Sequence, residues 1–535
     1  MKKLISLLCA GVLATSLCAG LTGCTGGKDY DPDNFIADTT NPQIVKEPIT
    51  LKVFVPKHSL HASYSSMALF TEASRITNIQ FEFVEADVDA LEEKRALAWE
   101  SKKSEMPDLF LFGNEVAEQT QLSKNGAIYP LEDLIEEYAP NYKALMEKYP
   151  DIEKISTLND GHIYSFSSVK NTPRDLTCKQ YINTTLLEQA GIEELPTTLG
   201  EYKTALQAMK DIQPMSKQAN FKPLGSSKLK NTKNFVMSAF GYVETGIEVK
   251  HDGSNQVVYV PYEEEYKAYL TYLNELYKDG LLDNDVFETT DNKLIQKGEA
   301  GNLGSFDYAA DFLVVGYEES SDYEAVGPLL SGGYGGINNT NKVWMASSEV
   351  TATTAIIPTT TPYQKEIVRL MDFFYSDYAV QLLVAGKEGT HWNWKDASQS
   401  KWEYLLGSSD TNIELFRGTF SPNVGIGAAF YWDKEFVYKQ SDAYIDKLNE
   451  VSEAYAEYFV EAYPSYVKFT EEELLEIANL ERSLNDYIQT FEINCIKGSN
   501  GADINADWAE HLATLKSLKV ERLVEIYQTA LNRAI

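Results

Sequence analysis

Cysteine is scarce in this chain. Five cysteines occur among 535 residues, and three of them, Cys9, Cys18 and Cys24, lie in the first 24 positions. Cys178 and Cys495 are the two that remain, which is too few for a fold stapled by disulfides. The sequence leaves open whether these two pair, and a pair of isolated buried thiols is the favoured alternative.

Basic residues are also in short supply. The chain has 47 Lys and Arg against 79 Asp and Glu, which gives a formal net charge of −32. An acidic chain repels phosphate backbones, so this balance argues against nucleic acid as a partner. Beyond Leu21 no apolar run approaches the roughly 20 residues that a membrane-spanning helix needs.

The common catalytic motifs are missing. The six histidines form no His-Glu-x-x-His pattern, and no Gly-x-Ser-x-Gly elbow occurs. The glycine-rich run from Ser331 to Gly336 lacks the Lys and the Ser/Thr of a phosphate loop. The alternating Asp29, Asp31 and Asp33 lack the glycine and the final Glu of a calcium loop. We therefore expect no cofactor, no metal and no catalysis, and a surface glycoside hydrolase or lyase stays the alternative.

The amino terminus has the features of a secretory signal. Lys2 and Lys3 precede an uncharged apolar run that ends at Leu21. The Leu-Thr-Gly-Cys sequence that ends at Cys24 resembles the bacterial lipobox, which implies cleavage before Cys24, a diacylglycerol thioether on its sulfur and an acyl chain such as palmitate on the new amino terminus. A signal anchor is the alternative, but glycine, serine and threonine weaken the run as a spanning helix. We expect a signal peptide over 1–23.

The next residues predict a flexible tether. Residues 24–45 are polar, rich in turn-forming types and poor in apolar periodicity, a composition that buries little surface. The mature protein is then expected at the outer face of the cell membrane, held by its lipid in the Gram-positive manner.

Strand and helix patterns alternate after residue 45. Period-two or continuous apolar runs predict strands at 49–56, 79–84 and 107–112, and helical spacing predicts helices at 65–77 and 90–101. Such alternation is typical of an α/β fold with a parallel sheet covered by helices. Ligands of such sheets bind beyond the carboxyl ends of the strands, which makes candidates of His58, His61, Tyr64, Asn114 and Glu115 in the loops after the first and third strands.

A series of short motifs follows in a fixed order. They are Met106-Pro107-Asp108-Leu109, Gly126-Ala127-Ile128-Tyr129-Pro130-Leu131, Asp160-Gly161-His162-Ile163-Tyr164, Leu195-Pro196-Thr197-Thr198 and Gly386-Lys387-Glu388-Gly389-Thr390-His391-Trp392. In this order the chain resembles the extracellular solute-binding proteins of ATP-driven carbohydrate importers, in their long Gram-positive lipoprotein form. The resemblance covers residues 46–535.

This resemblance implies a two-lobed, periplasmic-binding-protein-like fold. Each lobe is expected to hold a mostly parallel sheet flanked by helices, with a helical carboxyl-terminal extension. The amino-terminal lobe is expected to comprise 46–165 and 306–390, and the carboxyl-terminal lobe 166–305 and 391–535. A carbohydrate, expected to be an oligosaccharide, binds between the lobes, hinge closure encloses it, and the protein, expected to be a monomer, delivers it to the membrane permease of an ABC importer.

Sugars present hydroxyl edges and apolar faces, so aromatic clusters beside polar residues are further candidates. The sequence has 33 Tyr, 23 Phe and 7 Trp. The candidates are Tyr164, Phe306, Asp307, Tyr308, His391, Trp392, Trp394, Tyr431 and Trp432. Core packing is the alternative for each aromatic residue. On the binding hypothesis, Trp392→Ala weakens sugar binding and leaves the melting temperature nearly unchanged.

Overall fold

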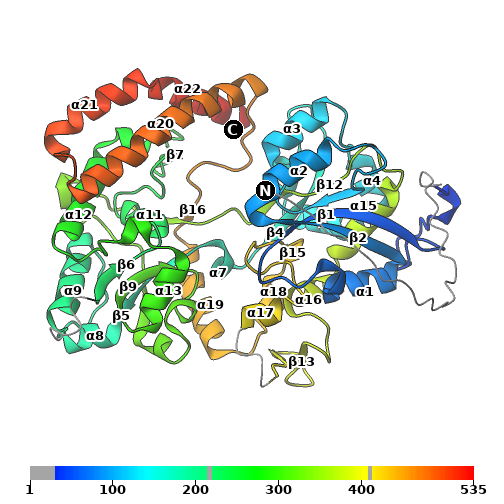
Figure 1. Cartoon of the computed structure of the whole chain (residues 1–535), viewed down its shortest axis with the longest axis horizontal. Coiled ribbons are helices and arrows are strands. Elements are labelled where there is room, and N and C mark those ends of the chain that lie inside the picture. Colours follow the sequence, from blue (N-terminus) through cyan, green and yellow to red (C-terminus); the bar gives the residue numbers. More distant parts are fainter. Residues whose placement is uncertain (1–29, 214–219, 408–412) are drawn as a thin grey trace, which may run out of the picture.

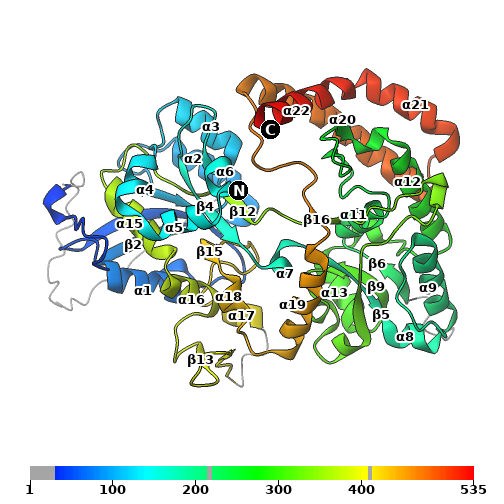
Figure 2. The same ribbon diagram turned by 180° about the vertical axis from the view of Figure 1, so that it is seen from behind.

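The computed structural model describes residues 30–213, 220–407 and 413–535. The chain forms two α/β lobes side by side, joined by several crossing segments (Figure 1). The same arrangement is seen from behind in Figure 2, where three long helices of the carboxyl-terminal region lie over the second lobe.

The first lobe is built on a six-stranded sheet with the strand order β15-β4-β12-β3-β1-β2. Its strands are β1 (Ile49–Lys57), β2 (Ile79–Asp87), β3 (Leu109–Leu111), β4 (Ser165–Lys170), β12 (Val350–Ile356) and β15 (Tyr431–Trp432). Strand β1 pairs in parallel with β2 and β3, whereas β12 is antiparallel to both of its neighbours. The three strands that the sequence pattern predicted, β1, β2 and β3, are therefore parallel to one another.

Helices cover both faces of this sheet. They are α1 (Ala68–Thr77), α2 (Leu91–Trp99), α3 (Val116–Lys124), α4 (Glu132–Tyr138), α5 (Pro140–Lys148), α6 (Asp151–Ser156), α15 (Gln364–Phe374), α16 (Asp377–Ala385), α17 (Ile413–Arg417) and α18 (Lys434–Val437). A small hairpin of β13 (Trp392–Trp394) and β14 (Trp402–Tyr404) completes the lobe.

The alternation of β1 explains the two covered faces. Val53 and Val55 belong to the main core cluster of the lobe, together with Phe70 of α1. Phe54 points the other way and packs on Phe110, which stacks on Trp99 with ring centroids 4.0 Å apart. Successive side chains of a strand face opposite sides of the sheet, so one apolar strand supports both layers of helices.

The second lobe contains a four-stranded sheet with the order β10-β5-β9-β6. Its strands are β5 (Lys179–Asn183), β6 (Lys222–Gly225), β9 (Leu303–Tyr308) and β10 (Tyr323–Val326). Only β6 and β9 pair in parallel, and the other two pairings are antiparallel. The expectation of a mostly parallel sheet thus fits the first lobe and is wrong for the second.

The helices of the second lobe include the carboxyl-terminal extension. They are α8 (Thr184–Gln189), α9 (Leu199–Asp211), α11 (Lys230–Ser238), α12 (Glu264–Lys278), α13 (Asp291–Glu299), α14 (Phe312–Val315), α19 (Ala443–Ala456), α20 (Glu471–Lys497), α21 (Ile504–Ser517) and α22 (Val520–Ala534). Two short pairs accompany them, β7 (Ile247–Val249) with β8 (Val257–Tyr259) and β11 (Trp344–Met345) with β16 (Phe459–Val460).

The lobe boundaries differ from the sequence expectation at two places. The chain returns to the first sheet at Val350, and not at Phe306, because Phe306 is fully buried in the second lobe within β9. It leaves the first lobe after Val437, and not at 391, because Trp392 and Trp402 pack into the core of the first lobe. Residues 306–345 therefore belong to the second lobe, and residues 391–407 and 413–437 contribute to the first.

The expected tether is shorter than 24–45. Ile44 and Val45 are buried in the first-lobe core, and Phe35 packs edge-on against Tyr138. Arg369 of α15 donates hydrogen bonds of 2.6 Å to the carbonyl oxygens at positions 36 and 41. The chain is therefore part of the folded lobe by residue 35. The polar composition of this segment gave no sign of that packing. Residues 24–29 lie outside the described residues.

Cys178 and Cys495, the two cysteines among the described residues, are free thiols, so they do not pair. Among the helices of the described residues, none is both long enough and apolar enough to cross a bilayer.

Trp392 gives a direct test of core packing. Its side chain is fully buried, its indole N–H donates a 2.9 Å hydrogen bond to the carbonyl oxygen of Gly386, and its ring meets those of Trp402 and Phe436. Trp392→Ala should therefore lower the free energy of unfolding by about 3–5 kcal/mol, as large buried aromatics do. Urea denaturation measures this loss, and the half-buried Trp394→Ala should cost less. An unchanged stability together with weaker sugar binding would restore the original interpretation of Trp392.

Candidate functional site

Among the residues that the structure describes, three segments cross between the lobes. The first, residues 171–178, includes the short helix α7 (Pro173–Leu176) and joins β4 to β5. The second, residues 346–349, joins β11 to β12, and the third, residues 438–442, joins α18 to α19 (Figure 1). Hinge motion of two lobes about such crossings opens and closes the space between them.

A cavity of about 440 Å³ lies at this hinge and is lined from both lobes. We call it the hinge cavity. Its wall includes Arg174 and Asp175 from the first crossing, Tyr404, Arg417 and Trp432 from the first lobe, and Phe312 and Tyr317 from the second. Its volume falls within the roughly 300–1,000 Å³ that is usual for small-molecule sites.

The Asp175 carboxylate is the centre of a polar cluster in this cavity. It accepts hydrogen bonds from the indole N–H of Trp432 at 2.8 Å, the hydroxyl of Thr172 at 2.7 Å and the guanidinium of Arg174 at 3.2 Å. Burial raises the pKa of Asp175, but the Arg174 charge and these hydrogen bonds outweigh it, so the pKa is lowered. The carboxylate therefore stays ionised at neutral pH and holds the indole in a fixed orientation.

Arg417 supplies a cation near the ring of the same indole. Its guanidinium carbon lies 6.0 Å from the Trp432 ring centroid, and one nitrogen lies 2.7 Å from a Glu414 oxygen. Burial lowers the pKa of Arg417, but the charges of Glu414 and Tyr404 reverse the effect, so the pKa is raised. A planar guanidinium beside an aromatic ring can donate paired hydrogen bonds to adjacent hydroxyls while the ring meets an apolar face.

The second lobe contributes an accessible aromatic face to this cavity. Tyr317 is 42% exposed and stacks on Phe312 with ring centroids 4.8 Å apart, while Tyr444 meets it edge-on at 4.9 Å. An exposed ring held by two neighbours presents a flat, preorganised surface, which is the usual platform for the apolar face of a ring-shaped solute.

A second cavity, of about 540 Å³, adjoins the hinge cavity and shares Arg174, Asp175 and Ala309 with it. We call it the second-lobe cavity. It lies at the carboxyl ends of β6 and β9, the position at which ligands of parallel strands bind. Asp307 at the end of β9 accepts hydrogen bonds of 2.9 Å from Asn231 and 2.7 Å from Thr232, both on α11.

Lys179 and Gln180 line the second-lobe cavity at the start of β5. Lys179 is buried and donates to the carbonyl oxygens of Arg174 at 2.7 Å and Thr177 at 3.2 Å, so it fastens the first crossing to the second sheet. Burial lowers the pKa of Lys179 to about 8. The Oε1 atom of Gln180, also buried, has no hydrogen-bond partner among the described residues.

Two of the residues that the sequence predicted for the site line these cavities, Trp432 and Asp307. The others serve structural roles or lie elsewhere. Phe306 is buried in the second sheet, and Tyr308 is half-buried at the end of β9. Tyr431, beside Trp432, is buried, accepts from Lys148 at 2.9 Å and donates to Asp433 at 2.6 Å.

The loops after β1 and β3 are packed by internal contacts. Tyr64 is fully buried and donates to the carbonyl oxygen of Pro56 at 2.7 Å, and His61 contacts the carbonyl oxygen of Val424 at 2.7 Å. His58 is half-buried and its ring lies against Gly425, where an added Cβ would stand 2.5 Å from it.

The remaining candidates are also held by their neighbours. Asn114 is buried and donates to the carbonyl oxygen of Thr353 at 3.0 Å, and Glu115 is exposed and lies 3.6 Å from Arg95. Tyr164 is buried and donates to Asp160 at 2.9 Å. His391 packs on Phe420, and Trp394 packs edge-on against the buried Trp392.

Sequence reasoning missed Arg174, Asp175, Lys179, Arg417 and Tyr317. A signal for the first two was present, because Thr-Pro-Arg-Asp begins one residue after the strand at 165–170, and a charged pair beside a proline favours a loop. Arg417 and Tyr317 carry no local signal, because their place in the cavity depends on how the two lobes meet.

Solved structures that superpose on this chain include solute-binding proteins associated with ABC transporters. Searched against family models, the chain matches none. The HMO-binding ABC-transporter solute-binding protein of Bifidobacterium longum infantis superposes with a TM-score of 0.77 over 91% of this chain and 99% of that chain, at 20% identity. The fold class predicted from the sequence is thereby confirmed.

A curated relative points to the same class. The chain is 26% identical to the fructooligosaccharide ABC transporter substrate-binding protein FusA of Streptococcus pneumoniae serotype 4, over 97% of this chain and 96% of that protein. The structure of FusA with kestose superposes with a TM-score of 0.73, at 21% identity, over 91% of this chain and 99% of that chain. The resemblance to importer solute-binding proteins that the motifs indicated is therefore confirmed, and these named relatives are transporter components.

The lowered pKa of Lys179 predicts a pH effect on stability. Between about pH 8 and the unfolded-chain lysine pKa near 10.4, the unfolded chain holds a proton that the folded protein has released, so stability rises with pH. The free energy of unfolding of the wild type, relative to Lys179→Met, should gain about 1–3 kcal/mol across this window. Urea denaturation at a series of pH values measures the difference. A difference that stays constant through the window would mean that folded Lys179 keeps its proton.

Proposed function

We propose that the protein is the lipid-anchored extracellular receptor of an ABC importer, and that it holds an oligosaccharide in the hinge and second-lobe cavities. The observation that carries this proposal is the hinge cavity itself, which takes its walls from both lobes and from a crossing segment. A solute bound there contacts every part that moves when the lobes close.

Closure provides the transport signal without covalent chemistry. A solute that contacts both lobes binds the closed form more tightly than the open form and shifts the population toward it. Arg174 and Asp175 are suited to this role because they belong to the crossing and line both cavities. The closed form is then the species that the membrane permease receives.

The charge of the hinge cavity favours an uncharged sugar. Four carboxylates line it against two guanidinium groups, namely Asp175, Glu403, Glu414 and Asp442 against Arg174 and Arg417. A polyanionic glycan is repelled by this excess, whereas neutral hydroxyls donate to the carboxylates and accept from the guanidinium groups. The names of the relatives, a fructooligosaccharide receptor and an HMO receptor, support an oligosaccharide as solute.

A surface glycoside hydrolase or lyase is the alternative that the sequence left open. The relatives reported above are named as transporter binding proteins, which favours the receptor. Product analysis after incubation with each bound sugar separates the two functions, because a receptor returns the sugar intact and a hydrolase shortens it.

Tyr317 provides the sharpest test of the binding site. Tyr317→Ala removes the exposed ring of the hinge cavity and should weaken sugar binding by about 1–3 kcal/mol, roughly 5- to 150-fold in Kd. The melting temperature should change little because the ring is 42% exposed. Isothermal titration with fructo-oligosaccharides and milk oligosaccharides measures the loss in protein that begins at Thr25.

Tyr378→Ala is the matched control for this experiment. Tyr378 is 39% exposed on α16 and does not line either cavity. It should leave the affinity unchanged. Equal losses in both variants, or no loss in Tyr317→Ala, would place the sugar elsewhere.

Lipid attachment is proposed at Cys24, which lies outside the described residues. Its support is the lipobox-like sequence at the end of the apolar run. Cys24→Ala should abolish incorporation of labelled palmitate and release the protein from the membrane fraction, while sugar binding is retained. Undiminished labelling of the variant would refute attachment at this residue.

A further inference from the structure

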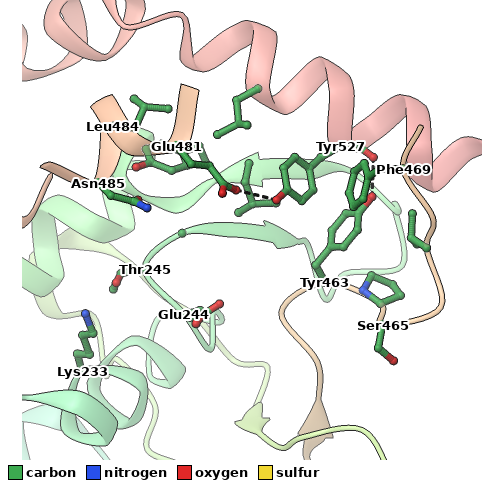
Figure 3. A pocket seen from close by; sticks show the side chains of 16 residues that line it. Lys233, Glu244, Thr245, Tyr463, Ser465, Phe469, Glu481, Leu484, Asn485 and Tyr527 are labelled. Atoms are coloured by element: carbon green, nitrogen blue, oxygen red, sulfur yellow. Dashed lines mark hydrogen bonds between the residues drawn. The ribbon is translucent and has the colours of Figure 1, made fainter. Parts of the chain in front are cut away.

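A third cavity continues the row formed by the first two. It has a volume of about 620 Å³ and lies in the second lobe, beneath α20 and α22 and beside the β7–β8 hairpin (Figure 3). We call it the helix cavity. Lys233 and Glu244 line both it and the second-lobe cavity. Since the second-lobe cavity in turn shares residues with the hinge cavity, each of the three cavities adjoins the next.

The far end of the helix cavity is aromatic. Tyr463, Phe469 and Tyr527 lie together there, with ring centroids 4.8–6.0 Å apart (Figure 3). All three side chains are only partly buried, so ring surface is left open at the wall. Such faces suit the apolar side of a sugar ring.

Polar groups in fixed positions surround these rings. The Tyr527 hydroxyl donates to Glu481 at 2.7 Å, and the Tyr463 hydroxyl donates to the backbone oxygen of residue 527 at 2.6 Å. The rings are therefore held rather than free to rotate away. Glu481, Glu244 and Lys233 leave the helix cavity with more acidic than basic groups, as in the hinge cavity.

Unpartnered acceptors occupy the middle of the row. The Oε1 atom of Gln180 and the Oδ1 atom of Asn234 are buried in the wall of the second-lobe cavity and have no hydrogen-bond partner among the described residues. A buried acceptor without a donor carries a cost in free energy, because it has lost its contacts with water and gained no partner. Sugar hydroxyls are donors that would remove this cost.

We propose that the helix cavity is a distal subsite for the far end of a long oligosaccharide, so that one solute chain runs through all three cavities. This inference rests on the proposed function and extends it to the length of the solute. Each cavity lies within the roughly 300–1,000 Å³ of a small-molecule site, and their sequence along the cleft favours a neutral chain of roughly four or more units over a mono- or disaccharide.

Gly246 allows the helix cavity to be filled without disturbing the other two. It lines this cavity, its φ is not positive, and an added Cβ would meet no atom within 4 Å. Gly246→Trp therefore places a large side chain in the subsite. Gly327 is the matched control, because it has the same open surroundings and lines none of the three cavities.

The experiment is titration calorimetry with ladders of one to six units of fructo-, gluco-, manno- and xylo-oligosaccharides and with milk oligosaccharides. The wild-type affinity should rise at least tenfold between the shortest binding sugar and its five- or six-unit homologue. Gly246→Trp should lose this rise and keep the affinity for the short sugar, and Gly327→Trp should behave as wild type. Phe469→Leu, which keeps an apolar side chain but removes the ring, should lose part of the same rise.

Two outcomes overturn the subsite while leaving the proposed function intact. One is a wild-type affinity that does not increase with chain length, and the other is a Gly246→Trp variant that binds the longest sugar as the wild type does. If no sugar of any length binds, the proposed function fails and the subsite fails with it.

Discussion

The first crossing, residues 171–178, is the segment on which the arrangement of the two lobes depends. Its Asp175 carboxylate holds the indole of Trp432 in the first lobe, while its Leu176 carbonyl oxygen accepts from the amide of Ser347 in the second crossing at 2.8 Å. Arg174 reaches Asn449 of α19, beyond the third crossing, at 3.4 Å. Any change of angle between the lobes therefore has to move this short, polar stretch of chain together with the other two crossings.

The same stretch forms part of the wall of two cavities, and this links recognition to motion. A solute bound there, as proposed, contacts the hinge, where a small displacement produces a large rotation of the lobes. Lys179 strengthens the link, because its ammonium group fastens the carbonyl oxygens of the crossing to the start of β5. Burying the charge of Lys179 costs free energy, and in return the first crossing is connected rigidly to the second sheet.

Local sequence patterns predicted the first lobe well. The predicted strands at 49–56 and 79–84 and the helices at 65–77 and 90–101 correspond to β1, β2, α1 and α2, because apolar periodicity records which face of an element is buried. Predictions failed where the structural role of a residue depends on segments that are far away in the sequence. Trp392 and Trp394 follow glycines in a polar segment, as a binding loop does, yet a hairpin and α18 enclose Trp392.

The site could be predicted only in part for the same reason. Asp307 and Trp432 were found because they stand beside aromatic residues at the ends of strands. Phe306 was expected at a crossing, but no local pattern reveals that β9 pairs with β5 and β6, so the returning strand was assigned to the wrong lobe. Arg417 and Tyr317 come from different lobes and face one cavity only after both have folded.

The proposed lipid attachment at Cys24 has a mechanical consequence. Only five residues separate Cys24 from Tyr30, whose ring packs edge-on against Tyr363 of the first lobe at 5.6 Å. The chain from Cys24 to Tyr30 therefore spans at most roughly 20 Å, even when it is fully extended. With a lipid on Cys24, the first lobe would be held close to the bilayer. The second lobe would have no direct attachment to the membrane. With such an anchor, closure of the two lobes would move the second lobe relative to a first lobe that stays close to the membrane.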